Sequence, residues 1–267
     1  RFCQHWLRSE TALEEIVTAA QLTSSDRILE IGPGTGILTR RLLPKVESLV
    51  AVEIDRNLCQ KLATTLGKQT NFLLLQGDFL KLNLAELLQP FPQFQQPDKV
   101  VANIPYNITG PILEKLLGKI SQPATTAYQS IVLLVQQEVG ERLTASPGTK
   151  AYGALSLRVQ YLASCELIYH VPAKAFSPPP KVDSVVVRLY PRTIGEPADN
   201  PRLLDSLIKL GFANRRKMLR NNLSSVITPD ELTQLLEQLN LNSQSRAENL
   251  SLEEWIKLSN LIGSPSM

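Results

Sequence analysis

Short apolar runs alternate with helical stretches along the first part of the chain, and this alternation constrains its fold more than any other feature. Each run is almost wholly apolar, as expected of strands in a parallel sheet that helices cover on both faces. The runs are Arg27–Ile31, Leu49–Ile54, Phe72–Gln76, Lys99–Asn103 and Ser130–Val135, and the helical patterns between them include Ile37–Leu43, Arg56–Leu66 and Gly110–Lys119. The pattern predicts an α/β protein with an open, doubly wound, parallel sheet.

The last part of the chain follows a different pattern. Two apolar runs, Glu166–His170 and Ser184–Tyr190, follow each other without a long helix, so we expect a hairpin-like pair that closes one edge of the sheet. The Pro-rich, polar segment Pro191–Pro201 is predicted to be a linker. Only helical patterns follow, namely Asn200–Asn222, Thr228–Leu239 and Ser251–Leu261. We therefore expect a catalytic domain over residues 1–192 and a small all-α domain over residues 200–267.

Composition excludes several classes of protein. The 267 residues suit one α/β domain with a small appendage. No apolar run approaches the roughly 18 residues that a membrane span requires, so we expect no membrane association. The three cysteines show no CxxC spacing, which predicts a reducing, cytoplasmic compartment and neither a disulfide framework nor a metal site. The net charge of +3 permits an anionic partner without requiring one.

Three glycines, Gly32, Gly34 and Gly36, lie between the first predicted strand and the helical stretch after it. Glycine at these positions allows a tight turn and lets a ligand lie against bare backbone. About 20 residues further on, Glu53 lies near the end of the next strand, where an acid can accept both hydroxyl hydrogens of a ribose. A glycine turn with a purely structural role is the alternative interpretation.

Two kinds of ligand fit such a loop, and they differ chemically. Dinucleotides place a pyrophosphate on helix N-terminal amides, usually with the spacing GxGxxG. Here the spacing is GxGxG, and the acid Glu30 precedes it, which suits a ligand with a cationic amino group and no phosphate, such as S-adenosylmethionine. Asp78, after the third strand, can accept a hydrogen bond from the amine of the cofactor's adenine. These features predict a Rossmann-like class I S-adenosylmethionine-dependent methyltransferase fold and disfavour a nicotinamide dehydrogenase.

The fourth strand ends in the tetrapeptide Asn103-Ile104-Pro105-Tyr106, which fits the pattern [DNS]-[ILP]-P-[FYW] of methyltransferases that act on exocyclic amino nitrogens or amides. An aromatic amine is a weak nucleophile because its lone pair is delocalised into the ring. The Asn103 side-chain oxygen and the Ile104 carbonyl can hold its two N–H groups, while Pro105 stiffens the turn. Asn103 is also expected to belong to the cofactor site. Tyr106 offers a face on which an extruded base can stack. A plain Asn-Pro turn is the alternative.

With these motifs in place, nearly the whole chain resembles the KsgA/Dim family of ribosomal RNA adenine N6,N6-dimethyltransferases, relatives of the Erm resistance methyltransferases. The segment Phe2–Leu7 resembles the family's F-G-Q-N-F-L, from which it departs at Cys3, His5 and Trp6. The resemblance implies that this segment packs over the cofactor, so that His5 and Leu7 belong to the cofactor site. The segment Ala175–Ser184 resembles F-x-P-x-P-K-V-D-S, and it implies that Phe176 stacks on the target adenine opposite Tyr106.

A basic segment opens the helical lobe. It contains Arg215, Arg216, Lys217 and Arg220, and Arg216 and Arg220 would share a helix face by their spacing of four. Such a cluster suits contacts to phosphates, although a basic run can also be a solvated face. The segment resembles the family's F-x-x-R-R-K-x-L-x-N-x-L, which favours docking to ribosomal RNA or packing between lobes.

The resemblance implies that S-adenosylmethionine supplies methyl groups to N6 of two adjacent adenines in the 3′-terminal hairpin loop of small-subunit (16S) ribosomal RNA. The partner would be the immature 30S subunit, and the enzyme would act as a monomer. An Erm-like enzyme acting on 23S ribosomal RNA is one alternative, and the longer P-x-P-K-V-D-S loop and R-R-K segment resemble the KsgA branch more. A non-catalytic assembly or transcription factor is another, disfavoured by the intact Asn103–Tyr106 motif.

Overall fold

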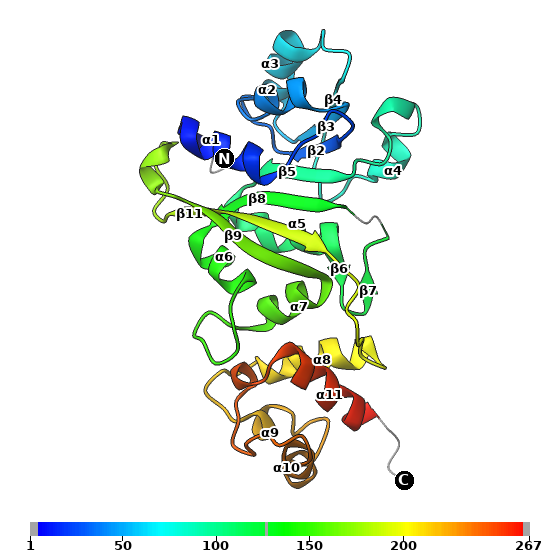
Figure 1. Cartoon of the computed structure of the whole chain (residues 1–267), viewed down its shortest axis with the longest axis vertical. Helices are drawn as coiled ribbons and strands as arrows, with labels where there is room; N and C mark the ends of the chain where they lie inside the picture. The colour runs from blue at the N-terminus through cyan, green and yellow to red at the C-terminus, as the bar shows by residue number, and fades with distance from the viewer. Residues whose placement is uncertain (1–4, 126–127, 264–267) are drawn as a thin grey trace. The chain divides into compact units, whose positions relative to one another are not determined.

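The computed structural model describes residues 5–125 and 128–263 and divides into two compact units (Figure 1). The first unit combines residues 1–116, 125–140 and 165–191, and the second combines residues 117–124, 141–164 and 192–267. The second unit thus includes two segments from within the region expected to form the catalytic domain. None of the helices among the described residues combines the length and the apolar character that crossing a bilayer would require.

A seven-stranded sheet forms the centre of the first unit, in the order β4-β3-β2-β5-β8-β11-β9. Strands β4, β3, β2, β5 and β8 are parallel, and β11 runs antiparallel to β8. The bounds are β2 Arg27–Ile31, β3 Ser48–Glu53, β4 Phe72–Gln76, β5 Lys99–Asn103, β8 Ser130–Gln136, β9 Ala163–Val171 and β11 Ser184–Pro191. The predicted strands are confirmed, and so is the pair, β11 and β9, that closes one edge. The Rossmann-like α/β fold class is therefore confirmed, with a mixed rather than purely parallel sheet.

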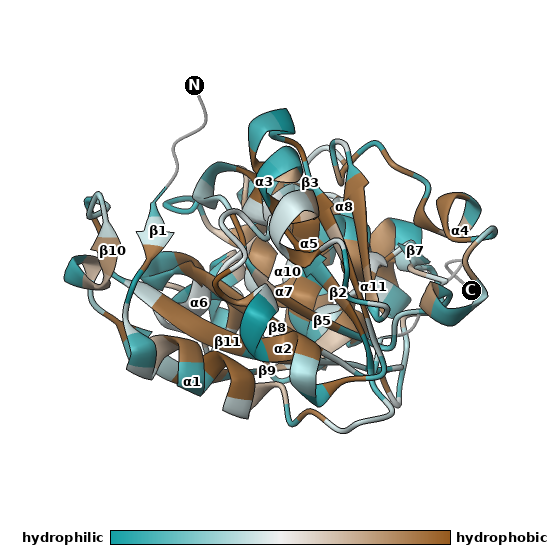
Figure 2. Ribbon diagram, turned by 90° about the horizontal axis from the view of Figure 1, so that it is seen from above, coloured by the Kyte–Doolittle hydropathy of each residue, from teal (hydrophilic) through white to brown (hydrophobic). Residues whose placement is uncertain are grey.

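Helices pack on this sheet through apolar faces. Helix α1 (Glu10–Ala19) buries Leu13 and Ile16 against β8 and β11, and Ser9 caps its first turn by accepting a hydrogen bond from the Ala12 N–H. The other helices are α2 (Thr39–Leu42), α3 (Arg56–Leu66), α4 (Leu84–Leu87), α5 (Thr109–Leu117) and α6 (Gln137–Leu143). Figure 2 shows hydrophobic residues, in brown, along much of β11, and most residues of β8 and β11 are buried.

A buried ion pair joins the starts of β2 and β5. The Lys99 ammonium lies 2.7 Å from the Asp26 carboxylate and also donates to the Gln21 carbonyl, and both charged side chains are almost fully buried. Burial by itself would raise the pKa of the Asp26 carboxyl, but hydrogen bonds from Lys99 and Thr23 lower this pKa below its ordinary value. The pair fixes β2 beside β5 at the edge of the sheet where these strands begin.

The second unit is helical apart from a two-strand ladder of β6 (Gly118–Lys119) and β7 (Gln122–Pro123). Its helices are α7 (Ala154–Leu162), α8 (Pro201–Gly211), α9 (Leu219–Asn222), α10 (Pro229–Gln238) and α11 (Leu252–Gly263). Trp255 is fully buried at its centre, and α7 packs on α8 and α11. Thr228 caps α10 by exchanging hydrogen bonds with Glu231.

One predicted helix is wrong. Residues 200–222 form α8 and the short α9 with an irregular segment between them. Helix α8 ends at Gly211, where the Trp255 ring packs against the bare backbone and the Asn222 amide donates to the carbonyls of Gly211 and Asn214. Arg216 lies in this irregular segment and Arg220 in α9, so the two do not share a helix face.

We expect Asp26→Asn to lower the free energy of unfolding by about 3–5 kcal/mol, because it leaves the Lys99 ammonium buried without its carboxylate. The contribution should be present at neutral pH and decline as the pH falls, since the folded state lowers the pKa of this acid. Glu47→Gln is the control: it breaks the exposed Arg27–Glu47 pair and should cost at most about 1 kcal/mol. Urea unfolding curves check both, and equal losses would contradict the assignment.

Candidate active site

The candidate site lies where the order of the strands reverses. From β2 the chain builds outward through β3 and β4, and it then crosses to place β5 on the other side of β2. In open α/β sheets a crevice forms at such a point, beyond the carboxyl ends of the strands. Gly32 follows β2 and Asn103 ends β5, and a Cβ atom at Gly32 would lie 4.0 Å from the Asn103 carbonyl oxygen. The two strongest sequence motifs therefore meet here.

The glycine loop has the backbone conformation that glycine permits. Gly32, Gly34 and Gly36 have φ values of +69°, +59° and +77°, in the left-handed region that other residues rarely adopt. A Cβ atom at Gly34 would lie 2.5 Å from the Trp6 ring. The loop thus presents bare backbone beneath an aromatic ring from the N-terminal segment.

Glu53 organises the loop from the end of β3. Its carboxylate is buried and accepts hydrogen bonds from the N–H groups of Gly34 (3.1 Å) and Asp55 (2.9 Å). An ionised carboxylate has about four lone-pair sites. Two are used by the backbone, so Glu53 retains acceptor capacity for the paired hydroxyls of a ribose.

Glu30 is the most unusual acid in the structure. It is 1% exposed, and its Oε2 atom has no hydrogen-bond partner. Burial, reinforced by the negative charge of Glu53, raises the pKa of Glu30 to about 8. A buried carboxyl beside a second acid ionises more readily when a cationic amino group binds next to it, and it offers no positive charge or N–H donor to a pyrophosphate. The residues present therefore fit S-adenosylmethionine better than a dinucleotide.

Asp78 lies just beyond β4 in a tight turn. Its Oδ1 accepts from the Leu80 N–H at 3.0 Å, and the neighbouring Phe79 is buried in the core. The contact of Asp78 with a cofactor adenine stays a prediction. Sequence reasoning missed Lys115, whose ammonium donates to the carbonyls of Phe79 (2.5 Å) and Leu82 (2.6 Å) and so holds this turn. A lone lysine in a helical pattern gives no signal of such a role.

The Asn103–Tyr106 turn is anchored at both ends. Ile104 is 2% exposed, so its side chain anchors the turn in the protein interior. Pro105 precedes a short 3₁₀ turn, Tyr106–Ile108. The Tyr106 hydroxyl lies 2.6 Å from the buried Ser184 hydroxyl at the start of β11. Ser184 orients the Tyr106 ring, and its only signal in the sequence was its place at the end of the P-K-V-D-S loop.

A short antiparallel ladder joins the N-terminal segment to the loop that carries Phe176. Strand β1 (Trp6–Leu7) pairs with β10 (Phe176–Ser177), with Leu7 opposite Phe176. Both of these side chains are buried in the main apolar core, at 2% and 4% exposure. The predicted contacts of Leu7 with a cofactor and of Phe176 with a base stay predictions, and in this structure protein atoms cover both side chains.

His5 precedes this ladder and lies beside Tyr106, and its predicted contact with the cofactor stays a prediction. Its ring is stacked with Tyr106, with centroids 6.2 Å apart and an angle of 20° between planes. Its Nδ1 atom lies 2.8 Å from the Pro178 carbonyl oxygen. The residues before it in the F-x-Q-x-x-L motif, Phe2, Cys3 and Gln4, lie outside the described part of the chain.

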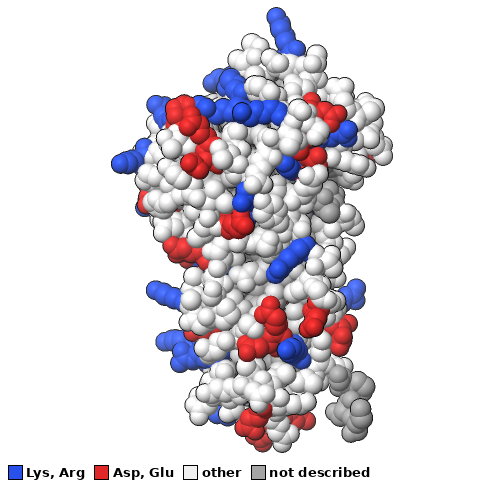
Figure 3. Space-filling view, viewed as in Figure 1, with Lys and Arg blue, Asp and Glu red and all other residues white. Residues whose placement is uncertain are grey.

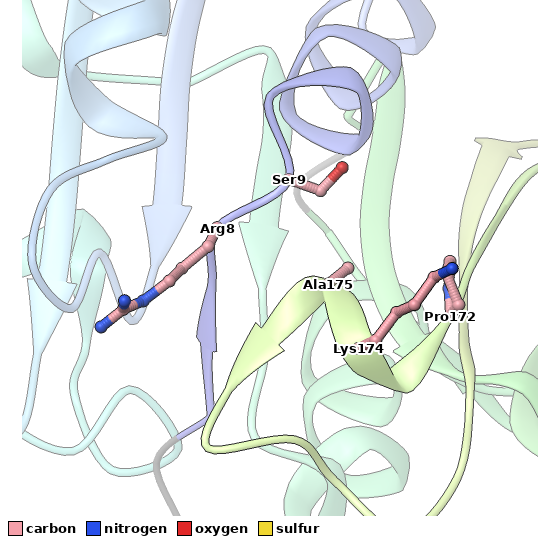
Figure 4. Close-up of a pocket in the computed structure, with 5 residues that line it drawn as sticks. All are labelled: Arg8, Ser9, Pro172, Lys174 and Ala175. Carbon is pink, nitrogen blue, oxygen red and sulfur yellow. The ribbon is translucent and has the colours of Figure 1, made fainter.

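A pocket of about 340 Å³ lies beside the ladder, lined by Arg8, Ser9, Pro172, Lys174 and Ala175 (Figure 4). The Arg8 N–H donates to the Ala175 carbonyl and extends the ladder by one hydrogen bond. Figure 4 shows that the Arg8 side chain extends away from Lys174. Arg8 and Lys174 therefore do not point into the pocket together as a binding site for an anion would require.

The basic segment lies wholly in the second unit. Arg215 pairs with Glu248 at 2.7 Å and donates to the Tyr152 carbonyl, so its charge already has a partner in the protein. Arg216 and Lys217 are exposed, and Arg220 is half-buried. On the face shown in Figure 3, basic and acidic groups are interspersed, with no single charged surface. The predicted RNA contacts of these four residues stay predictions.

Comparison with known proteins identifies the family. Residues 1–264 match the family model described as Ribosomal RNA adenine dimethylase. The chain belongs to the ribosomal RNA adenine dimethylase family. It is 66% identical over 262 residues to Ribosomal RNA small subunit methyltransferase A of Nostoc sp., covering 98% of this chain and 97% of that protein. It is 65% identical over 266 residues to the protein of the same name from Rippkaea orientalis, covering 100% and 98%.

Solved structures agree with this family assignment. A dimethyladenosine transferase from Plasmodium falciparum is similar with a TM-score of 0.76 and 28% identity, covering 95% of this chain and 96% of that one. The 23S rRNA methyltransferase ErmE is similar with a TM-score of 0.73 and 25% identity, covering 97% and 100%. The resemblance of the sequence motifs to the KsgA/Dim family is therefore confirmed.

The pKa of Glu30 is ordinarily 4.5, and the fold raises it to about 8. We therefore expect Glu30 to make the free energy of unfolding depend on pH between these two values. In this window the folded state binds a proton that the unfolded chain has released, so stability should fall as the pH rises. Glu30→Gln, which cannot ionise, should show a shallower fall. Glu14→Gln, at an exposed position on α1, is the control and should follow the wild type. Parallel pH profiles for all three proteins would contradict this.

Proposed function

We propose that this protein transfers methyl groups from S-adenosylmethionine to the exocyclic N6 of adenine in small-subunit ribosomal RNA, producing dimethyladenosine. The observation that carries the proposal is the meeting of the glycine loop with the Asn103–Tyr106 turn at the reversal of strand order. The names of the relatives at 65–66% identity support the small-subunit substrate. When bound, the cofactor supplies an electrophilic methyl group on a sulfonium centre.

Within this proposal, the chain's own residues orient the acceptor. The Asn103 side-chain oxygen and the Ile104 carbonyl accept hydrogen bonds from the two N–H groups of the adenine amine, which reduces the delocalisation of its lone pair and directs it towards the methyl donor. Tyr106, fixed by Ser184, stacks on the base, a contact worth about 1–3 kcal/mol. The reaction needs no strong base, so most of the rate comes from orientation. Gly32, Gly34, Glu30, Glu53 and Asp78 hold the cofactor.

The finer details are proposals of the same kind. We place the two methylated adenines next to each other in the 3′-terminal hairpin loop of 16S ribosomal RNA, within an immature 30S subunit in the cytoplasm. The enzyme acts as a monomer, as the family resemblance implies. The helical domain over residues 200–267 contacts the RNA through exposed Arg216 and Lys217.

The second candidate is an Erm-like enzyme acting on 23S ribosomal RNA. The structural similarity to ErmE favours it, because both chains are covered almost completely. The identity to ErmE is 25%, against 66% to a protein named as a small-subunit methyltransferase. Methyl transfer to undermethylated small subunits, compared with large subunits and followed by mapping of the modified base, separates the two.

We expect Asn103→Ala to abolish methyl transfer and leave S-adenosylmethionine binding nearly unchanged, because it removes an acceptor for the amine and no contact to the glycine loop. Calorimetric titration with the cofactor and transfer of labelled methyl groups to small subunits measure the two effects. The matched control is Asn107→Ala, at an exposed position in the same turn, which should retain activity. Unchanged turnover in Asn103→Ala would remove the orientation argument.

Neutralising Arg216, Lys217 and Arg220 together as glutamines should raise the KM for small subunits and make it less dependent on salt. Each lost phosphate contact lowers the slope of log affinity against log salt by about 0.7–0.9. Arg215→Gln is the control, because Glu248 already neutralises that charge. If the triple variant and the wild type had the same KM at every salt concentration, the basic segment would make no contact with the RNA.

A further inference from the structure

We propose that Lys115 is a positioning residue for the adenine of S-adenosylmethionine, because its ammonium fixes the turn from which Asp78 reaches the adenine amine. This role rests on the proposed function, in which Asp78 holds that end of the cofactor. The N–H groups of the Lys115 ammonium are directed to backbone carbonyls of the turn. Lys115 therefore acts through Asp78 and does not touch the cofactor.

Lys115 holds the turn after β4 by two carbonyl oxygens. Its ammonium donates to the Phe79 carbonyl at 2.5 Å and to the Leu82 carbonyl at 2.6 Å, and it lies 4.9 Å from the centroid of the Phe79 ring. Hydrogen bonds from a charged donor are stronger than those between neutral groups, and a cation is attracted to an aromatic face. Burial lowers the pKa of Lys115, and the negative charge of Asp78 partly offsets this effect. One side chain thus ties together both ends of residues 79–82.

The same turn sets the direction of the Asp78 carboxylate. The Asp78 carbonyl accepts from the N–H groups of Lys81 (2.9 Å) and Leu82 (3.1 Å). The Oδ1 atom of the carboxylate accepts from the Leu80 N–H at 3.0 Å. The Lys81 ammonium lies 3.9 Å from the Oδ2 atom, beyond hydrogen-bond distance, on a side chain that is 84% exposed. The Oδ2 atom therefore keeps acceptor capacity that an N–H group of an adenine amine can use.

The near end of the turn is fixed separately, on the ribose side of the candidate site. The Gly77 N–H donates to the Glu53 carbonyl at 2.8 Å, and Glu53 is the acid assigned to the ribose hydroxyls. Loss of the Lys115 ammonium releases the far end of the turn and leaves this hydrogen bond in place. The effect should therefore fall on the contact with the amine, while the ribose contacts survive.

Lys115 belongs to the helix that begins beside the target-base turn. Helix α5 spans Thr109–Leu117, and the buried Thr109 hydroxyl donates to the Tyr106 carbonyl at 3.2 Å. At about 1.5 Å per residue, the Cα atoms of Thr109 and Lys115 are separated by about 9 Å along the helix axis. A single helix thus connects the turn proposed for the acceptor base with the turn proposed for the adenine of the donor.

The test compares two ligands in Lys115→Met, which keeps the apolar stem of the side chain and removes its donors. The ligands are S-adenosylhomocysteine, the product of the proposed reaction, and its 6-deamino analogue, which carries hydrogen in place of the adenine amine. Calorimetric titration should show that the variant binds S-adenosylhomocysteine about 10-fold more weakly than the wild type does, as loss of a hydrogen bond to a charged acceptor implies. Its affinity for the analogue should stay near the wild-type value, because no amine is present to be misaligned.

Further variants separate the hydrogen bonds from general effects. Lys115→Arg restores cationic donors and should recover most of the affinity for S-adenosylhomocysteine. The matched control is Lys81→Met, which removes an exposed lysine from the same turn and should bind both ligands as the wild type does. In turnover, Lys115→Met should raise the KM for S-adenosylmethionine by about the same factor as the Kd and change kcat far less. If thermal unfolding shows that Lys115→Met is not folded, Lys115→Gln replaces it, because its side chain is too short to reach both carbonyls.

Three results would overturn the proposal and leave the proposed methyl transfer intact. Equal weakening of both ligands in Lys115→Met would mean that Lys115 supports the pocket as a whole. Unchanged binding of S-adenosylhomocysteine would mean that the turn keeps its shape without the ammonium. Equal affinity of the wild type for the two ligands would mean that Asp78 makes no contact with the amine. A wild-type protein that bound neither ligand would remove the proposed function itself.

Discussion

The parallel pairing of β2 with β5 is the constraint on which the rest of the structure depends. It brings together two segments that lie far apart in the sequence, the glycine loop and the Asn103–Tyr106 turn. At the opposite edge the Asp26–Lys99 ion pair joins the same two strands, so the register that aligns the site is fixed at both ends. In the proposed function, this adjacency brings the residues that hold the methyl donor next to the residues that hold the acceptor.

Much of the fold follows from local sequence. The strands of the sheet are short and apolar because both faces are covered, so their positions were predictable. The single helix expected over residues 200–222 was wrong: α8 ends at Gly211, where the distant Trp255 ring packs and the Asn222 amide donates to the Gly211 carbonyl. A helical pattern does not reveal a ring from a distant helix that packs against its end.

Part of the candidate site was also predictable from local sequence. Gly32, Gly34, Glu53 and Asn103 occupy fixed places at strand ends, where topology brings them together. Ser184 and Lys115 act through contacts across long stretches of chain, and their residue types carry no pattern. The orphaned oxygen of Glu30 was equally hidden, because the sequence shows an acid before the loop and not its burial.

The ladder between β1 and β10 is only two residue pairs long, yet its register has a chemical consequence. Side chains alternate between faces along an extended segment, so a slip of one residue exchanges the faces of every side chain. Deleting or inserting a single residue between this ladder and α1 would exchange the directions of an indole and an imidazole. The enzyme would keep all of its functional groups, but the indole would no longer cover the glycine loop and the imidazole would no longer stack on Tyr106.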